Sequence, residues 1–198
     1  MIKFIKGGMK GFDPLIYEWD EPVVREYCGK TIYGRKTKGF GEESFEYAGK
    51  FYNPSPWTQP MKYIKWNTES LVKAQIGKKV DFNFCLCGLY EEDGKGIPHH
   101  SDTVPTLDDI VVSLSFGAPR IFEWREYHYD IKKETNTSET YIDLEGNATI
   151  THYLLEDGDV LIFDGASQMT STHAVLDVVG ARDRVNLTFR TGINNVKH

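Results

Sequence analysis

The sequence predicts a mainly β fold of the α+β class, with short strands closing into a barrel or a double-sheet jelly roll and helix on one side. Runs of alternating or β-branched residues recur over the second half of the chain, separated by turn residues. One earlier stretch has apolar residues at helical spacing instead. At 198 residues, the chain suits a single compact domain, 1–198.

The predicted elements follow in order along the chain. Residues 1–27 contain several Gly and Pro residues and are expected to be irregular, whereas residues 28–53 are expected to form turns and short hairpins. A helix is expected from about Met61 to Gly77. The polar residues 127–152 are expected to form a long hairpin insertion or a surface loop. Five strands are expected, over 81–90, 110–117, 120–127, 159–165 and 184–192.

Composition limits the classes of function and the location. The formal net charge of −6 argues against a protein that binds nucleic acid through bulk positive charge, so any such contact must be local. The three cysteines are an odd number, and the first residues carry no long apolar segment. We therefore expect reduced thiols and an intracellular protein, cytoplasmic or nuclear, with no signal peptide and no membrane span. Two clusters of basic residues could supply local contacts: Lys30, Arg35, Lys36 and Lys38, and Lys62, Lys65, Lys73, Lys78 and Lys79.

The segment IPHHSD carries the first sign of chemistry. His100 and Asp102 are two residues apart, so in an extended segment both side chains point to one face and can chelate one cation. One His and one Asp supply two ligands of the facial triad of non-haem Fe(II) oxygenases. Alone, the motif also fits a surface histidine near an aspartate. The adjacent His99 points to the opposite face and is not expected to be a ligand.

Residues further along the chain strengthen this interpretation. His173, in STHAV, follows a predicted strand and could complete the triad from a neighbouring strand. Arg184 and Arg190 are six residues apart on one alternating strand, so both guanidinium groups lie on one face. Guanidinium groups bind carboxylates through paired hydrogen bonds, and 2-oxoglutarate is a dicarboxylate that chelates iron. The combination predicts an oxygenase that uses Fe(II), 2-oxoglutarate and O2.

Several segments then resemble a known family. GKTIYGRKTKGFGEESFEYAG, FNFCLCGLYEEDGKGIPHHSD, IVVSLSFGAPRIFEWR, LEDGDVLIFDGASQMTSTHAV and RVNLTFR are similar to the AlkB family of nucleic-acid dioxygenases, particularly its alkylation-repair branch. The resemblance covers roughly residues 28–192. It implies a double-stranded β-helix (jelly-roll) core over about 81–192. It also implies an N-terminal extension over about 1–80 that carries the helix and, in the hairpins around Arg35 to Tyr47, a nucleotide-recognition lid over a flipped base.

The resemblance also implies roles for individual residues. His100, Asp102 and His173 would hold the iron, and Arg184 with Tyr90 beside it would anchor the distal carboxylate of 2-oxoglutarate. The remaining expected residues are Asn186 and Arg190 near the metal end of the cosubstrate, and Arg35, Lys36, Phe40 and Tyr47 for the substrate.

The chain departs from the family pattern at two places. Gly88 stands where the family has an asparagine, two residues before its tyrosine. Thr103, Val104 and Pro105 stand where the family has further acidic residues after the metal aspartate, and Asp108 or Asp109 could substitute for them.

The implied function is oxidative demethylation of N-alkylated nucleobases in DNA or RNA, with release of formaldehyde, succinate and CO2. The expected partner is alkylated nucleic acid, and a monomer is expected. Three alternatives remain open from the residues: a 2-oxoglutarate oxygenase that hydroxylates a protein side chain or a small molecule, a catalytically silent nucleic-acid-binding relative, and a cupin-type metalloprotein. The cupin-type protein would not require the two arginines.

Overall fold

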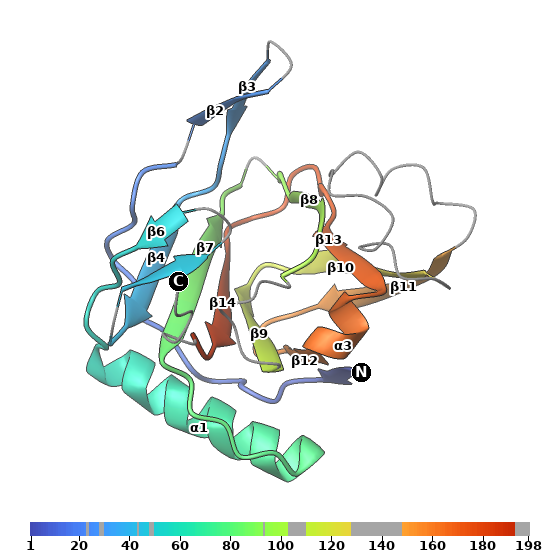
Figure 1. The fold of residues 1–198 in the computed structure, drawn as a ribbon. Coiled ribbons are helices and arrows are strands. Elements are labelled where there is room, and N and C mark those ends of the chain that lie inside the picture. The colour runs from blue at the N-terminus through green and yellow to red at the C-terminus, as the bar shows by residue number, and fades with distance from the viewer. Residues whose placement is uncertain are drawn as a thin grey trace, which may run out of the picture.

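Two antiparallel sheets form the body of the protein (Figure 1). The computed structural model describes residues 1–22, 24–27, 30–42, 44–47, 50–92, 94–102, 110–127 and 148–192, and of 24–27, 30–33, 45–47 and 50–52 the backbone alone. The six-stranded sheet has the order β1 (Ile2–Ile5), β12 (Val160–Asp164), β9 (Ile110–Gly117), β14 (Arg184–Arg190), β7 (Phe84–Tyr90), β4 (Thr37–Gly41). The four-stranded sheet has the order β11 (Ala148–Leu155), β10 (Arg120–Tyr127), β13 (Ser171–Val175), β8 (Ile97–His100).

Four further strands form two small hairpins, and two helices are described. β2 (Val24–Tyr27) pairs with β3 (Lys30–Tyr33), and β5 (Phe45–Tyr47) pairs with β6 (Lys50–Tyr52). Figure 1 shows the β2–β3 hairpin projecting away from the sheets. The helices are α1 (Gln59–Ile76) and the short α3 (Gly165–Gln168), which directly follows β12.

Side-chain alternation divides the core into two hydrophobic clusters. Successive residues of a strand point to opposite faces, so the six-stranded sheet presents one face to α1 and the other to the four-stranded sheet. On the helix side, Leu187 of β14 belongs to one cluster with Met61 of α1. Between the sheets, Phe163 of β12 packs against Trp124 of β10, with ring centroids 5.8 Å apart. Both faces of the six-stranded sheet therefore carry apolar packing.

Helix α1 begins and ends at recognisable caps. The hydroxyl of Thr58 accepts a hydrogen bond from the Met61 N–H, and Gly77, with φ of 74°, donates its N–H to Lys73 O at 3.0 Å. The helix starts two residues before the predicted Met61, because Pro60 lies in its first turn, where no backbone N–H is needed. Among the described residues, no helix combines the length and the apolar character that crossing a bilayer requires.

The structure confirms the mainly β fold with a helix on one side, the five predicted strands and, within 28–53, the β5–β6 hairpin. It also bears out the hairpin predicted around 127–152, because β10 and β11 pair antiparallel from Arg120↔Leu155 to Tyr127↔Ala148. It corrects one other prediction. Residues 1–27 are not irregular throughout, because β1 pairs with β12 and β2 with β3. Residues 128–147 lie outside the described part of the chain.

The N-terminal part is also more closely joined to the core than the division near residue 80 implies. β1 and β4 both belong to the six-stranded sheet, where β4 pairs with β7 from Thr37↔Gly88 to Gly41↔Phe84. Part of the segment expected to form a lid is therefore an edge strand of the main sheet.

The packing on the helix side of β14 predicts that Phe189 contributes strongly to the stability of the fold. Phe189 is fully buried, stacks on Trp57 at 6.2 Å between ring centroids and contacts Phe82 at 5.8 Å. Phe189→Ala should lower the free energy of unfolding by about 3–5 kcal/mol, because it leaves a cavity in a closed core. Urea denaturation followed by circular dichroism measures this change. Val179→Ala, at a fully exposed position, is the control and should alter stability by less than about 0.5 kcal/mol.

Candidate metal centre

Three potential metal ligands gather beside two adjacent strands. His100 ends β8 and pairs directly with His173 of β13, and Asp102 follows two residues after β8. The Nε2 atom of His100 lies 4.0 Å from Oδ1 of Asp102, and Nε2 of His173 lies 3.8 Å from Oδ2. The ligand atoms of all three residues lie within 4.8 Å of one another, so small side-chain rotations would bring them onto one ion. Two histidines and one carboxylate are the donor set of a facial triad, so the residues fit Fe(II).

His100 is oriented by its own backbone. Its Nδ1 lies 2.8 Å from the carbonyl oxygen of Pro98, and a carbonyl can only accept, so Nδ1 carries the proton. The lone pair is then on Nε2, the atom that faces Asp102. Burial lowers the pKa of His100, which favours the neutral form that a metal requires. The side chain is still 35% exposed, so this side of the site is open to reactants.

His173 is held by aromatic packing. Its ring stacks on Phe122 at 5.2 Å and on Trp124 at 6.0 Å, and it also contacts Phe163 at 5.4 Å between centroids. Within the described part of the chain, its Nδ1 meets no hydrogen-bond partner. Burial and then the neighbouring His100 lower the pKa of His173 to about 3, so the imidazole is neutral at physiological pH. Stacking thus replaces the hydrogen bond that commonly orients a ligand histidine.

Asp102 is fixed from two directions. Its Oδ2 accepts a hydrogen bond of 2.7 Å from Nη2 of Arg190, in a pair with both side chains almost fully buried. Its backbone N–H donates to Oε1 of Gln168 at 2.8 Å, and the hydroxyl of Ser101 donates to the Gln168 carbonyl at 3.0 Å. Arg190 therefore positions the metal carboxylate, while Gln168 of α3 positions the backbone that carries it.

A second buried cation lies on the same face of β14. Arg184 is 1% exposed, and its Nη2 donates to the hydroxyl of Ser115 at 2.8 Å. Its Nε and Nη1 meet no partner in the described part of the chain, and its guanidinium lies 4.8 Å from the centre of the Tyr90 ring. An unsatisfied buried N–H costs about 1–3 kcal/mol, so these donors suit a ligand carboxylate. The two residues fit the distal end of 2-oxoglutarate.

Asn186 lies between the two arginines, but its donors are already used. Its Nδ2 donates to the hydroxyl of Ser113 at 2.8 Å and to the carbonyl of Leu114 at 2.9 Å, and its Oδ1 accepts from Thr188 at 3.0 Å. An amide nitrogen has two N–H groups, so none remains for a cosubstrate carboxylate. Asn186 thus ties β14 to β9, and its place in the lining of the cosubstrate pocket stays a prediction.

The residues expected to contact substrate do not form one group. Lys36 is paired with Glu91 at 2.8 Å, and Phe40 is 5% exposed within the helix-side core. A buried Phe40 does not offer a base a ring to stack on. Arg35 instead lies against Tyr90, 5.1 Å from the ring centre. The side chain of Tyr47 lies outside the described part of the structure, as do residues 103–109.

The side chain of His99 belongs to a polar network that is separate from the metal cluster. Nε2 of His99 lies 2.8 Å from Glu123, and its Nδ1 lies 3.1 Å from the hydroxyl of Thr172, so both ring nitrogens are engaged away from the metal cluster. Glu123 also pairs with Arg125 at 2.7 Å and His152 at 2.6 Å. Burial raises the pKa of Glu123, but these hydrogen bonds outweigh it and lower the pKa to about 2. No motif in the sequence indicated that His152 would pair with Glu123.

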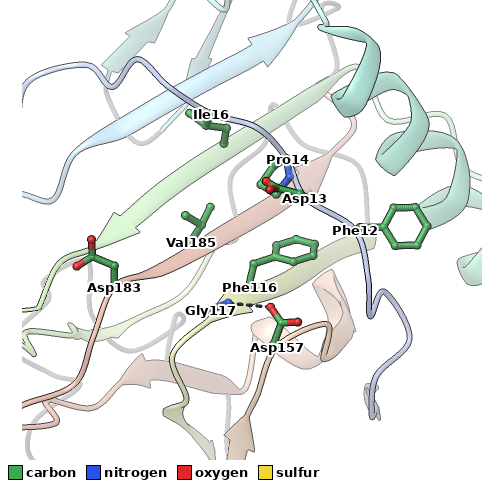
Figure 2. Close-up of a pocket in the computed structure, with 9 residues that line it drawn as sticks. All are labelled: Phe12, Asp13, Pro14, Ile16, Phe116, Gly117, Asp157, Asp183 and Val185. Atoms are coloured by element: carbon green, nitrogen blue, oxygen red, sulfur yellow. Dashed lines mark hydrogen bonds between the residues drawn. The ribbon is translucent and has the colours of Figure 1, made fainter.

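A cavity of about 300 Å³ lies on the opposite face of β14 (Figure 2). Val185 lines it and points away from Arg184 and Asn186, since neighbours on a strand face opposite ways. Three carboxylates also line it, and they would repel a dicarboxylate. The lining of this cavity therefore does not suit 2-oxoglutarate, whereas the buried donors of Arg184 do. The lining residues are Phe12, Asp13, Pro14, Ile16, Phe116, Gly117, Asp157, Asp183 and Val185.

The comparisons with known proteins agree with this chemistry. The chain matches the 2OG-Fe(II) oxygenase superfamily over residues 22–190. It is 33% identical over 160 residues to the rat protein named alpha-ketoglutarate-dependent dioxygenase alkB homolog 3, covering 79% of this chain and 50% of that one. The human protein of the same name is 34% identical over 161 residues, covering 79% and 51%. The chain thus spans about half the length of these relatives.

A solved structure supports the fold. The structure of OsALKBH1 superimposes with a TM-score of 0.54 at 17% identity and covers 96% of this chain and 97% of that one. The match to the superfamily and the His-Asp-His cluster confirm the predicted Fe(II), 2-oxoglutarate and O2. The chain belongs to the 2OG-Fe(II) oxygenase superfamily.

Proposed function

We propose that the protein oxidatively demethylates N-alkylated nucleobases in DNA or RNA. The observation that carries the proposal is the joint placement of the His100, Asp102 and His173 cluster with the arginines of β14, one of which binds Asp102 directly. The resemblance to the AlkB family supplies the class of substrate, and the relatives named alkB homolog 3 support it.

The proposed roles of the residues follow from their contacts. His100 and His173 would bind Fe(II) through Nε2, and Asp102 through its carboxylate, held in place by Arg190 and Gln168. Arg184 would donate Nε–H and Nη1–H to the distal carboxylate of 2-oxoglutarate, with the Tyr90 ring keeping water from the guanidinium. The aromatic rings around His173 would exclude water from the closed side of the metal.

Iron supplies the redox chemistry by which O2 and 2-oxoglutarate become succinate and CO2 while a substrate C–H bond becomes C–OH. On an N-methyl group the product is an N-hydroxymethyl base. Its C–N bond then breaks, the bonding electron pair returns to the base nitrogen, the hydroxyl loses its proton, and formaldehyde leaves. A methyl group on a base inside a duplex cannot reach a metal at the floor of a protein site, so the base must leave the stack.

The proposal predicts direct repair of methylated oligonucleotides. Incubation with Fe(II), ascorbate, 2-oxoglutarate and short strands carrying 1-methyladenine or 3-methylcytosine should remove the mass of one CH2 group per methyl, as read by mass spectrometry. The variants His100→Ala and Asp102→Ala should each abolish both demethylation and succinate formation. Succinate formed without any mass change would reject nucleobase demethylation and favour a protein or small-molecule substrate.

The ligand assignment has its own test in metal binding. His100→Ala should weaken Mn(II) binding by more than about 100-fold, beyond the loss typical of outer-sphere changes. His99→Ala is the matched control, since His99 points toward Glu123 and Thr172. It should cost no more than about tenfold. Isothermal titration without O2 measures both. Equal losses in the two variants would contradict the assignment.

A further inference from the structure

Arg35 is expected to contact the substrate, but it lies against Tyr90, a residue expected to bind the cosubstrate. It lies in the short segment between β3 and β4, and its guanidinium carbon is 5.1 Å from the centre of the Tyr90 ring. The guanidinium carbon of Arg184 is 4.8 Å from the same centre. Two cations therefore contact one buried aromatic ring.

Gly88 is what admits Arg35 to this position. Gly88 lies two residues before Tyr90 on β7, so both residues face the same side of the sheet. A Cβ built on Gly88 would overlap Nε of Arg35 and lie 3.1 Å from its Cδ. Any larger residue at position 88 would displace the Arg35 side chain from Tyr90. Arg35 can therefore lie against Tyr90 only because residue 88 is a glycine.

The two cations have buried donors to spare. Within the described part of the chain, Nε of Arg35 and both Nε and Nη1 of Arg184 are buried without a hydrogen-bond partner, and no carboxylate pairs with either guanidinium. Burial lowers the pKa of Arg184 most, Tyr90 raises it in part, and the charges of Arg120 and then of Arg35 lower it. Two like charges on one ring repel one another, and a dianionic ligand in contact with both would reduce this repulsion.

We propose that Arg35 is a second cationic contact for 2-oxoglutarate, placed over Tyr90 by Gly88, and that it determines affinity for the cosubstrate and not for the nucleic acid. The proposal rests on the assignment of Arg184 and Tyr90 to the cosubstrate pocket. The cosubstrate would then contact two guanidinium groups, those of Arg35 and Arg184, which both lie against the Tyr90 ring.

Cosubstrate binding to the Mn(II)-loaded protein without O2 tests this directly. Arg35→Ala should weaken 2-oxoglutarate binding by about tenfold, the factor expected for one charge-assisted hydrogen bond. Arg35→Lys should recover part of the loss. Lys36→Ala is the matched control, because the neighbouring Lys36 pairs with Glu91 at the surface, and it should bind normally. Titration calorimetry gives the affinities, and thermal unfolding without cosubstrate shows that the variants fold.

The variant Gly88→Ala tests the same proposal independently. It should weaken 2-oxoglutarate binding as much as Arg35→Ala does, and the double variant should be no weaker than either, because both changes remove one contact. Normal 2-oxoglutarate binding by Arg35→Ala, with reduced affinity for a methylated oligonucleotide, would overturn the proposal. If Arg184→Ala also binds normally, the pocket itself is misassigned. Absence of demethylation would leave this binding test intact and would count against the substrate class alone.

Discussion

The alternation of side chains along β14 is the constraint on which the site depends. β14 lies between β9 and β7, and its pairing with both fixes which residues face the four-stranded sheet. Arg184, Asn186 and Arg190 lie on that face, whereas Leu187 and Phe189 belong to the helix-side core. A slip of one residue would place the arginines against α1 and the apolar residues in the site. The same registry that stabilises the fold therefore positions the charges.

This arrangement buries charged side chains, which is unfavourable for the stability of the fold. Asp102 and Arg190 are almost fully removed from water, and a buried ion pair rarely adds net stability compared with apolar packing. What the pair provides is orientation of the carboxylate, which Gln168 reinforces through the backbone. Arg184 carries a larger penalty, since burial disfavours its charged form and part of its guanidinium has no partner within the described residues. Such a group is stable only because the surrounding sheet holds it in place.

The sequence could predict whatever followed from periodicity and motif spacing. The five strands, and the grouping of His100, Asp102 and His173, rest on alternation and on a two-residue separation that any extended segment reproduces. It could not predict contacts that depend on tertiary placement. Gln168, Ser113 and Ser115 carry no local signal, because each acts only through the strand or helix that happens to adjoin the site. Phe40 is expected to contact the substrate from the resemblance, but its strand pairs with β7 and its ring lies in the helix-side core.

The position of Arg35 has a consequence for how the affinities of two ligands are linked. Arg35 lies in the segment between β3 and β4, directly after the β2–β3 hairpin. Figure 1 shows this hairpin projecting away from the sheets. In the proposed pocket, a cosubstrate that engages Arg35 also restrains the base of that hairpin. By thermodynamic linkage, any factor by which 2-oxoglutarate tightens binding at the hairpin is the factor by which a ligand there tightens 2-oxoglutarate. The cosubstrate and any ligand of the hairpin would then bind cooperatively.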